Sequence, residues 1–148
     1  MYRHILIATD GSERASKGVQ HGLALAARLQ AQATVLTVSE PINTGFDDAL
    51  GWSAVATSLP DFQNARNEAA RKVLDAAAAE GAQAGVTPQL LHVADRYAAE
   101  TIVDTAERQG CDLIVMASHG RRALGRLLLG SQTSEVLAHC GVPVLVIR

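Results

Sequence analysis

The sequence predicts an α/β protein in which an open five-stranded parallel sheet is covered by helices on both faces. Short apolar runs rich in Val and Ile alternate along the chain with helix-length segments that carry an apolar stripe, and such alternation is typical of parallel sheets. Aromatic residues make up only 3% of a chain that is 48% hydrophobic, so Ala, Val, Leu and Ile must build the core. The length, 148 residues, is close to the size at which one hydrophobic core closes, and a single domain over residues 1–148 is expected.

The opening of the chain predicts a strand, a helix and a second strand. Residues 4–9 (HILIAT) form a short apolar run that Asp10-Gly11-Ser12 stops, which predicts a strand buried on both faces, a tight turn and a helix N-cap. Apolar residues then recur at helical spacing from Ala15 to Gln30, and residues 33–38 return to a β-branched run.

The same alternation continues to the end of the chain. The pattern predicts a helix over 64–84, a strand over 89–93, a helix over 98–108, a strand over 112–117, a helix over 131–139 and a strand over 142–147. Pro143 lies near the start of the last strand, where a missing N–H is tolerated. Each helix must bury its apolar stripe against the sheet, so we expect right-handed crossovers between parallel strands.

One stretch does not follow this alternation. Residues 40–62 contain two prolines, two glycines and the lone Trp52, with no sustained hydrophobic period, and the sequence predicts a long irregular excursion there. Long loops in compact domains are usually lids or binding segments, so Trp52 is either a lid or contact residue or a packing residue.

Composition limits the classes of partner. A formal net charge of -2 gives no global reason to expect binding to nucleic acid or to an anionic membrane. No run of about 18 apolar residues and no export signal is seen, and a cytoplasmic protein is expected. Cys111 and Cys140 have no CxxC spacing, which favours buried, reduced thiols over redox or metal roles.

Two segments follow the carboxyl ends of predicted strands, where open parallel sheets bind ligands. They are residues 8–12 and 116–131. In the second, Gly120 and Gly130 can take backbone angles barred to other residues and let amide groups approach a phosphate, while Ser131 opens a helix whose first N–H groups point outward. These features alone also fit a glycine-bounded surface loop with solvated arginines.

The motifs at both ends of the chain resemble those of a known family. Ser118-His119-Gly120, nine residues and then Gly130-Ser131, the closing GVPVLVI and the opening ILIATDGS are together similar to the universal stress protein family over nearly the whole chain. The resemblance implies a Rossmann-like fold of the adenine nucleotide alpha hydrolase-like type. In the ATP-binding branch the motif is Gly, two residues, Gly, nine residues, Gly, then Ser or Thr. Ala117 stands where the first glycine would be, which matters only if that position needs a positive φ or close contact with the nucleotide.

The resemblance also implies a set of nucleotide-binding residues. They are Ala8, Thr9, Asp10, Val38, Met116, Ala117, His119, Gly120, Gly130, Ser131, Gln132 and Thr133. Within this set, Ala8, Val38 and Met116 would lie against the base or ribose, and Asp10 near the ribose or the water shell of a metal. The amides of His119, Gly120, Gly130, Ser131, Gln132 and Thr133 would surround the phosphates, with the hydroxyls of Ser131 and Thr133 as extra donors.

Simpler roles stay open for some of these residues. Asp10 also fits a helix cap, while Val38 and Met116 also fit plain core positions. The resemblance to the family therefore carries the functional reading of these three residues.

The function implied by the resemblance is that of an ATP-binding regulatory module in the stress response, with Mg²⁺ or Mn²⁺ as an accompanying ion. The sequence shows no dedicated catalytic set, no Walker loop and no GxGxxG after the first strand. Two alternatives stay open: a nucleotide-free dimeric scaffold, which Ala117 favours, and a slow ATPase. The resemblance further implies a homodimer that pairs the last strands, and an apolar edge strand over 142–147 suits that role.

Overall fold

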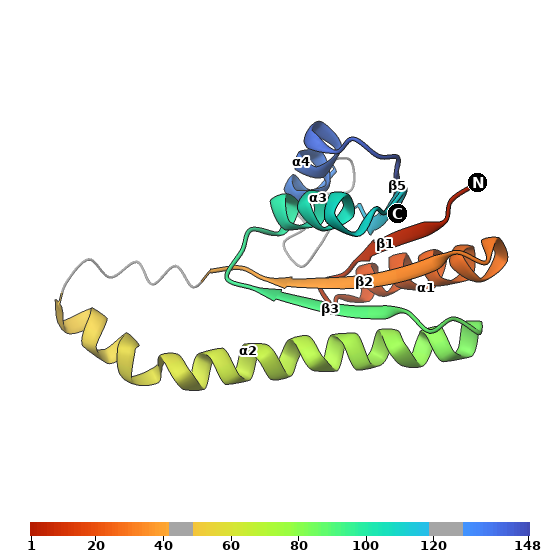
Figure 1. The fold of residues 1–148 in the computed structure, drawn as a ribbon. Coiled ribbons are helices and arrows are strands. Elements are labelled where there is room, and N and C mark those ends of the chain that lie inside the picture. Colours follow the sequence, from red (N-terminus) through yellow and green to blue (C-terminus); the bar gives the residue numbers. More distant parts are fainter. Residues whose placement is uncertain (42–48, 119–128) are drawn as a thin grey trace.

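The computed structural model describes residues 1–41, 49–118 and 129–148 and contains alternating strands and helices (Figure 1). The elements are β1 (His4–Ala8), α1 (Glu13–Leu29), β2 (Gln32–Ser39), α2 (Ala49–Ala84), β3 (Gln89–Ala94), α3 (Ala98–Gln109), β4 (Leu113–Ala117), α4 (Ser131–His139) and β5 (Val144–Ile147). The strands form one parallel five-stranded sheet in the order β3-β2-β1-β4-β5. The predicted fold class is confirmed.

The strand order reverses next to β1. Ile7 pairs with Val35 of β2 on one side and with Val115 of β4 on the other. The chain therefore winds from β1 through β2 to β3, then crosses back to β4 and β5 on the opposite side. In sheets of this kind the crevice for a ligand lies at the carboxyl ends of the strands where the order reverses.

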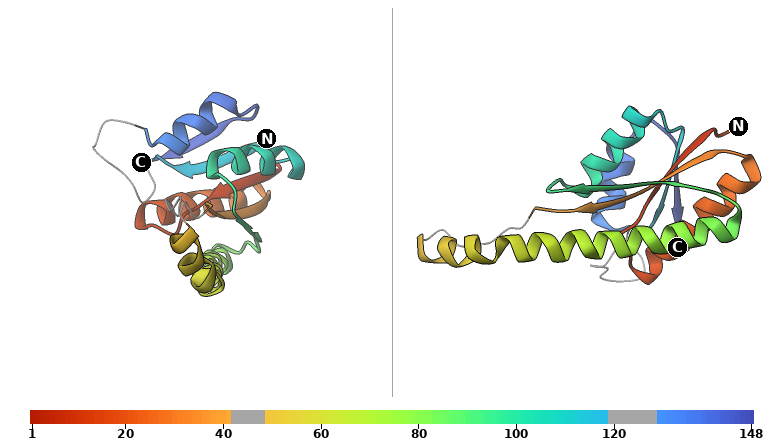
Figure 2. Two further views of the ribbon diagram at one scale, coloured as in Figure 1. Left: turned by 90° about the vertical axis from the view of Figure 1, so that its left-hand side faces the viewer. Right: turned by 60° about the horizontal axis from the view of Figure 1, so that its bottom comes forward.

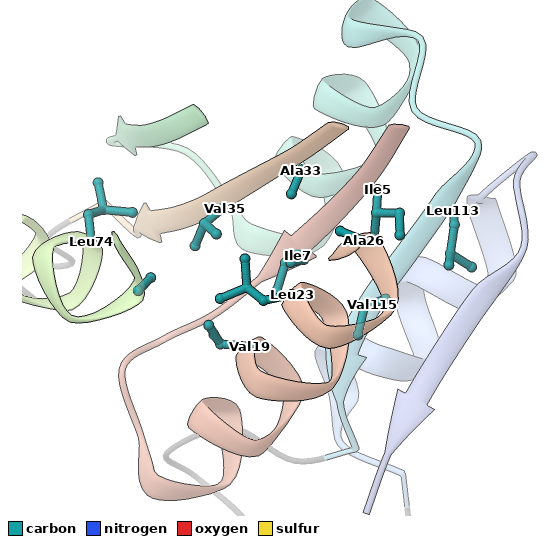
Figure 3. Packing of buried hydrophobic residues seen from close by; sticks show 11 residues of the cluster. Ile5, Ile7, Val19, Leu23, Ala26, Ala33, Val35, Leu74, Leu113 and Val115 are labelled. Atoms are coloured by element: carbon teal, nitrogen blue, oxygen red, sulfur yellow. The ribbon is translucent and has the colours of Figure 1, made fainter. Parts of the chain in front are cut away.

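Helices cover both faces of the sheet, with α1 and α2 on one side and α3 and α4 on the other (Figure 2). On the first face, Val19 and Leu23 of α1 pack against sheet residues that include Ile7 (Figure 3). On the second face, Ile102 of α3 and Val136 of α4 belong to a cluster with residues of β1, β2 and β4. Because strand side chains alternate, each of the central strands serves both clusters.

The turn after β1 depends on a glycine. Gly11 has a φ of +77°, and a Cβ built on it would come within 2.4 Å of the Val73 side chain. Both the left-handed backbone and the contact with α2 thus require glycine. Ser12 then caps α1, because its hydroxyl oxygen accepts a hydrogen bond from the amide of Ala15 at 3.2 Å.

The predicted irregular excursion over 40–62 is wrong from Ala49 onward, because α2 begins there and continues through Pro60. Pro60 and the nearby glycine indicated a break, yet proline inside a helix removes one hydrogen bond and bends the axis, and Ala-rich sequence on both sides sustains the helix. The first turns of α2 extend past the sheet (Figure 1). The side chain of Trp52 lies outside the described residues, as does segment 42–48.

A smaller difference concerns the start of the last strand, while the thiols agree with the prediction. The last strand begins at Val144, not at residue 142, and Pro143 precedes it, accepting a hydrogen bond from the amide of Ile114 at 3.0 Å. Cys111 is buried and Cys140 partly buried, both without a disulfide, as expected. Among the residues that the structure describes, no helix combines the length and the apolar character that a bilayer span requires.

Candidate functional site

A pocket of about 110 Å³ lies at the carboxyl ends of β1, β2 and β4, chiefly on the side of the sheet that carries α3 and α4. One water molecule needs only about 15 Å³ by a comparable measure, so the pocket has room for a much larger group. Its lining residues are Ala8, Thr9, Asp10, Ala15, Leu36, Val38, Ala98, Ile102, Met116, Ala117, Gln132 and Thr133. The wall is mostly apolar, and its polar groups come from the turn after β1 and the start of α4.

Most of the predicted site residues meet at this pocket. The lining includes Ala8, Thr9, Asp10, Val38, Met116, Ala117, Gln132 and Thr133. Gly130 and Ser131 do not line it but come directly before two residues that do. His119 and Gly120 lie outside the described residues.

Four lining residues were not predicted: Ala15, Leu36, Ala98 and Ile102. In the sequence they look like members of ordinary apolar stripes. Only Ala98 had a usable signal, since it opens the helix that follows β3 and therefore lies at the carboxyl edge of the sheet.

Asp10 organises the turn between β1 and α1. Its Oδ1 accepts a hydrogen bond from the amide of Ser12 at 2.9 Å, whereas the N-cap of α1 is Ser12 itself. The amide of Gly11 donates to the Thr9 hydroxyl at 3.2 Å. The helix-cap alternative for Asp10 is therefore wrong, and Asp10 lines the pocket from the turn that its side chain stabilises.

Ala117, the departure from the family motif, has an ordinary backbone. Among the described non-glycine residues, positive φ values occur only at Gln30 and Asp95. Position 117 thus has no need of the left-handed conformation that favours glycine. Compared with the glycine of the family motif, the Ala117 methyl group takes up space at the pocket wall.

Gly130 also differs from its expected conformation. Its φ of -58° is open to any residue, and its amide donates to the carbonyl of Ser118 at 2.8 Å. The predictions that Gly130 uses special backbone angles and turns its amide toward a phosphate are therefore wrong for this structure. Gly130 is instead the N-cap of α4 and supplies no capping side chain, so the first amides of that helix have no side-chain partner at the cap.

Thr133 has a structural role in this arrangement. Its hydroxyl lies 3.1 Å from the carbonyl oxygen of Ala117 and 3.2 Å from that of Ser118, and the residue is 2% exposed. Since a hydroxyl has one hydrogen to donate, the expected extra donor to a phosphate is already engaged in holding the end of β4 to α4. Ser131, by contrast, is exposed at the first position of α4.

The Gln132 side chain joins three segments around the pocket. Its Oε1 accepts from the amide of Ala99 at 2.9 Å, and its Nε2 donates to Glu40 Oε1 at 3.4 Å. Tyr97, the N-cap of α3, makes no side-chain cap, so Gln132 satisfies an amide that the α3 sequence leaves unpaired. The sequence indicates a role only for the amide of Gln132, because nothing in the local sequence indicates a side-chain contact with residues as distant as Glu40 and Ala99.

Carboxylates are sparse at the pocket. Asp10 is the only one among the described lining residues. In the described part of the chain, no group of three or more His, Cys, Asp or Glu side chains is placed to hold a metal ion.

The protein is a doubly wound α/β protein with a pocket at the carboxyl ends of the strands, where the strand order reverses. Proteins of this class bind ligands at that position. The sequence model of the universal stress protein family matches residues 1–148, and the chain belongs to that family. The resemblance carried by the terminal motifs is thereby confirmed.

Similar proteins come from bacteria and archaea. A universal stress protein from Thermus aquaticus is 32% identical over 148 residues, with both chains fully covered. The solved structure of MJ0577, a universal stress protein of Methanocaldococcus jannaschii, superposes with a TM-score of 0.81 at 29% identity and covers 99% of this chain and 96% of its own.

Two more distant structures of the family contain nucleotides. One is a universal stress protein in complex with cAMP, with a TM-score of 0.73, 20% identity and coverage of 99% of this chain and 97% of its own. The other is the Archaeoglobus fulgidus protein in complex with dAMP, with a TM-score of 0.65, 17% identity and coverage of 99% and 98%. At these identities the likeness shows the fold alone.

Proposed function

We propose that this chain, as one domain over residues 1–148, binds an adenine nucleotide and acts as a cytoplasmic, nucleotide-dependent regulatory module of the stress response, with ATP as the ligand. The observation that carries the proposal is the joining of two complementary subsites. An apolar pocket that suits a flat base leads directly to the start of a helix whose first amides lack a side-chain cap.

The apolar part of the pocket suits the base and the ribose. Val38 and Met116 supply hydrophobic walls from β2 and β4, and Ala98 and Ile102 supply the wall from α3. Asp10 offers carboxylate oxygens, which accept hydrogen bonds from ribose hydroxyls.

The start of α4 suits the phosphates. The helix dipole and the amides of Ser131 and Gln132 favour negative charge there, and Gly130 adds no side chain that would keep a phosphate away. The cAMP and dAMP complexes of other family members support an adenine nucleotide as the class of ligand. A Mg²⁺ or Mn²⁺ ion that accompanies ATP would be held mainly by the phosphates, with Asp10 as the nearest protein carboxylate.

Replacing Gly130 with Val tests the phosphate subsite. The backbone of Gly130 accepts any residue, so the fold should persist while two methyl groups obstruct the approach to α4. We expect ATP affinity, measured by isothermal titration calorimetry, to fall by about a hundredfold or more, which corresponds to roughly 3 kcal/mol.

Gly141→Val is the matched control. A Cβ on Gly141 meets no atom within 4 Å, and the residue lies at the opposite end of α4. ATP affinity should be unchanged in this variant. Equal affinities in Gly130→Val and the wild type would refute the phosphate subsite.

A nucleotide-free scaffold is the second candidate function. It is favoured by the internal use of the Gly130 amide and the Thr133 hydroxyl, which removes two expected phosphate donors. Mass spectrometry of the denatured, freshly purified protein separates the two functions. Co-purified adenine nucleotide supports the binding module, and its absence supports the scaffold.

A further inference from the structure

A second pocket, of about 230 Å³, lies where β2 and β3 end beside α2. It is lined by Ser39, Gln63, Arg66, Asn67, Ala94 and Asp95. Side chains along β2 alternate between the two faces of the sheet. Val35 and Ser39 therefore point to the face covered by α1 and α2, whereas Val38 points to the face covered by α3 and α4. The second pocket is therefore on the opposite face of the sheet from the nucleotide pocket.

One stripe of α2 explains why this pocket is polar. Gln63, Arg66 and Asn67 are spaced to share a helix face, and the same stripe continues into buried Ala70 and Leu74 over the sheet. The stripe is thus apolar where it covers the sheet and polar where it reaches the end of β2 and β3. Arg66 and Ser39 are partly buried there, whereas Gln63 and Asn67 are exposed, so the pocket is open to solvent and a ligand can reach it directly.

Opposite charges meet at the wall of the pocket. Arg66 Nη1 lies 3.3 Å from Asp95 Oδ1, and the two side chains are 23% and 57% exposed. Arg66 also donates to the carbonyl oxygen of Glu40. A partly exposed ion pair of this kind contributes little to stability because solvent screens it, so a ligand that offers both charges can replace it at little cost.

The backbone holds the acidic side of the pocket in place. Asp95 has a φ of +57°, and its amide donates to the carbonyl of Ser39 at 2.8 Å. Behind Ser39 lies His92, whose Nε2 is 2.9 Å from the Ser39 hydroxyl oxygen. Burial, followed by the nearby Arg66, lowers the His92 pKa and so favours the neutral imidazole, and Arg66 and Asp95 are the charged residues that line the pocket.

We propose that this pocket binds a small zwitterion, chemically a free α-amino acid, with its carboxylate on Arg66 and its ammonium group on Asp95. A simple anion would be repelled by Asp95 and a simple cation by Arg66, whereas a dipolar ligand satisfies both. The carboxamides of Gln63 and Asn67 supply donors and acceptors for the rest of the ligand. The assignment does not rest on the nucleotide function, since none of the residues that line this pocket lines the other.

Calorimetry on the full chain, with each standard amino acid in turn at about 5 mM, tests the proposal. At least one should bind with a dissociation constant below about 1 mM. Arg66→Met and Asp95→Asn should each weaken that binding by about tenfold or more, and Asn suits the positive φ at position 95. Arg71→Met, on an exposed position of α2, is the matched control and should bind normally.

Blocked ligands make the test independent of how well the variants fold. The methyl ester of the bound amino acid lacks the carboxylate, and its N-acetyl derivative lacks the ammonium group, so neither should bind. The proposal is overturned if no amino acid binds, if either blocked derivative binds as well as the parent, or if a folded Arg66→Met protein retains full affinity.

Discussion

Asp112 shows how one side chain can join two distant parts of the chain. Its oxygens accept hydrogen bonds from the amides of Arg3 at 2.8 Å and His4 at 3.0 Å, and so fasten the start of β1 beside the start of β4. Burial acts to raise the pKa of this carboxyl, but the amide hydrogen bonds from His4 and Arg3 outweigh it, and the net pKa is lowered. The charged form of Asp112 is therefore the form that stabilises the sheet.

Replacing Asp112 with Asn should lower the free energy of unfolding by about 1 kcal/mol at pH 7, because charged acceptors make stronger hydrogen bonds. A carboxyl whose pKa is depressed on folding stabilises above its unfolded pKa, near 3.9, and this contribution is lost as the pH falls through the folded value. Urea unfolding at pH 7 and pH 3 measures the difference. A difference between variant and wild type that stays constant with pH would contradict this role of the charge.

Some site residues could be recognised from the local sequence and others could not. Ala8, Asp10 and Met116 could be placed at the pocket from sequence, since each lies at or just after the end of a predicted strand and parallel strands end at one edge. The side-chain contacts of Gln132 and Thr133 could not, because each joins residues on different elements and nothing in the local sequence indicates the partner.

Among the elements, the strands and helices were predictable, including α2 from residue 64 to its end at Ala84, but the part of α2 before residue 64 was not. An element that packs against the core along its whole length carries a hydrophobic period, near 2 for strands and 3.6 for helices. Elements such as β4 and α1 pack in this way and are therefore recognisable in the sequence. The sequence before residue 64 has no sustained hydrophobic period and contains Pro60, which resembled a stop, although the first turns of α2 extend past the sheet (Figure 1).

Two glycines of α1 test how closely this helix packs on the sheet. A Cβ on Gly22 would lie 2.7 Å from fully buried Ile7, whereas a Cβ on Gly18 would meet the amide nitrogen of Ala117 at 3.4 Å, an ordinary contact. Gly22→Ala should lower the free energy of unfolding by about 1 kcal/mol, since overpacking exceeds the gain in helix propensity. Gly18→Ala should cause no loss. Chemical denaturation measures both, and equal effects at the two positions would contradict the packing described.

At the scale of the whole molecule, the topology leaves two edge strands, β3 and β5. Unpaired N–H and C=O groups on an edge are a template for pairing with another chain. The family resemblance implies a homodimer through the last strand, and Leu145 of β5 is 39% exposed. Leu90 of β3, with 37% exposure, provides a matched position at the other edge.

We expect a dimer at micromolar concentration in sedimentation velocity, and we expect Leu145→Lys to make it a monomer, because a charge on a self-paired strand is repelled by its symmetry mate. Leu90→Lys should remain a dimer. A monomeric wild type, or a Leu145→Lys variant that stays dimeric, would contradict pairing through β5.

Both pockets follow from the same topology, since parallel strands carry their carboxyl ends to one edge and the two faces of that edge are lined by different helices. The fold could be predicted from periodicity, but the second pocket could not. The second pocket forms because α2 passes beside the ends of β2 and β3. The position of a long helix along a sheet cannot be predicted from the sequence of the helix.

The pocket at the carboxyl ends of β1 and β4 is the proposed site of an adenine nucleotide. A crystal structure of the protein grown in millimolar ATP tests this proposal most directly. We expect the adenine ring between Val38 and Met116, with the phosphates at the start of α4 beside Ser131. An empty pocket at that concentration, or a nucleotide bound elsewhere on the protein, would contradict the proposal.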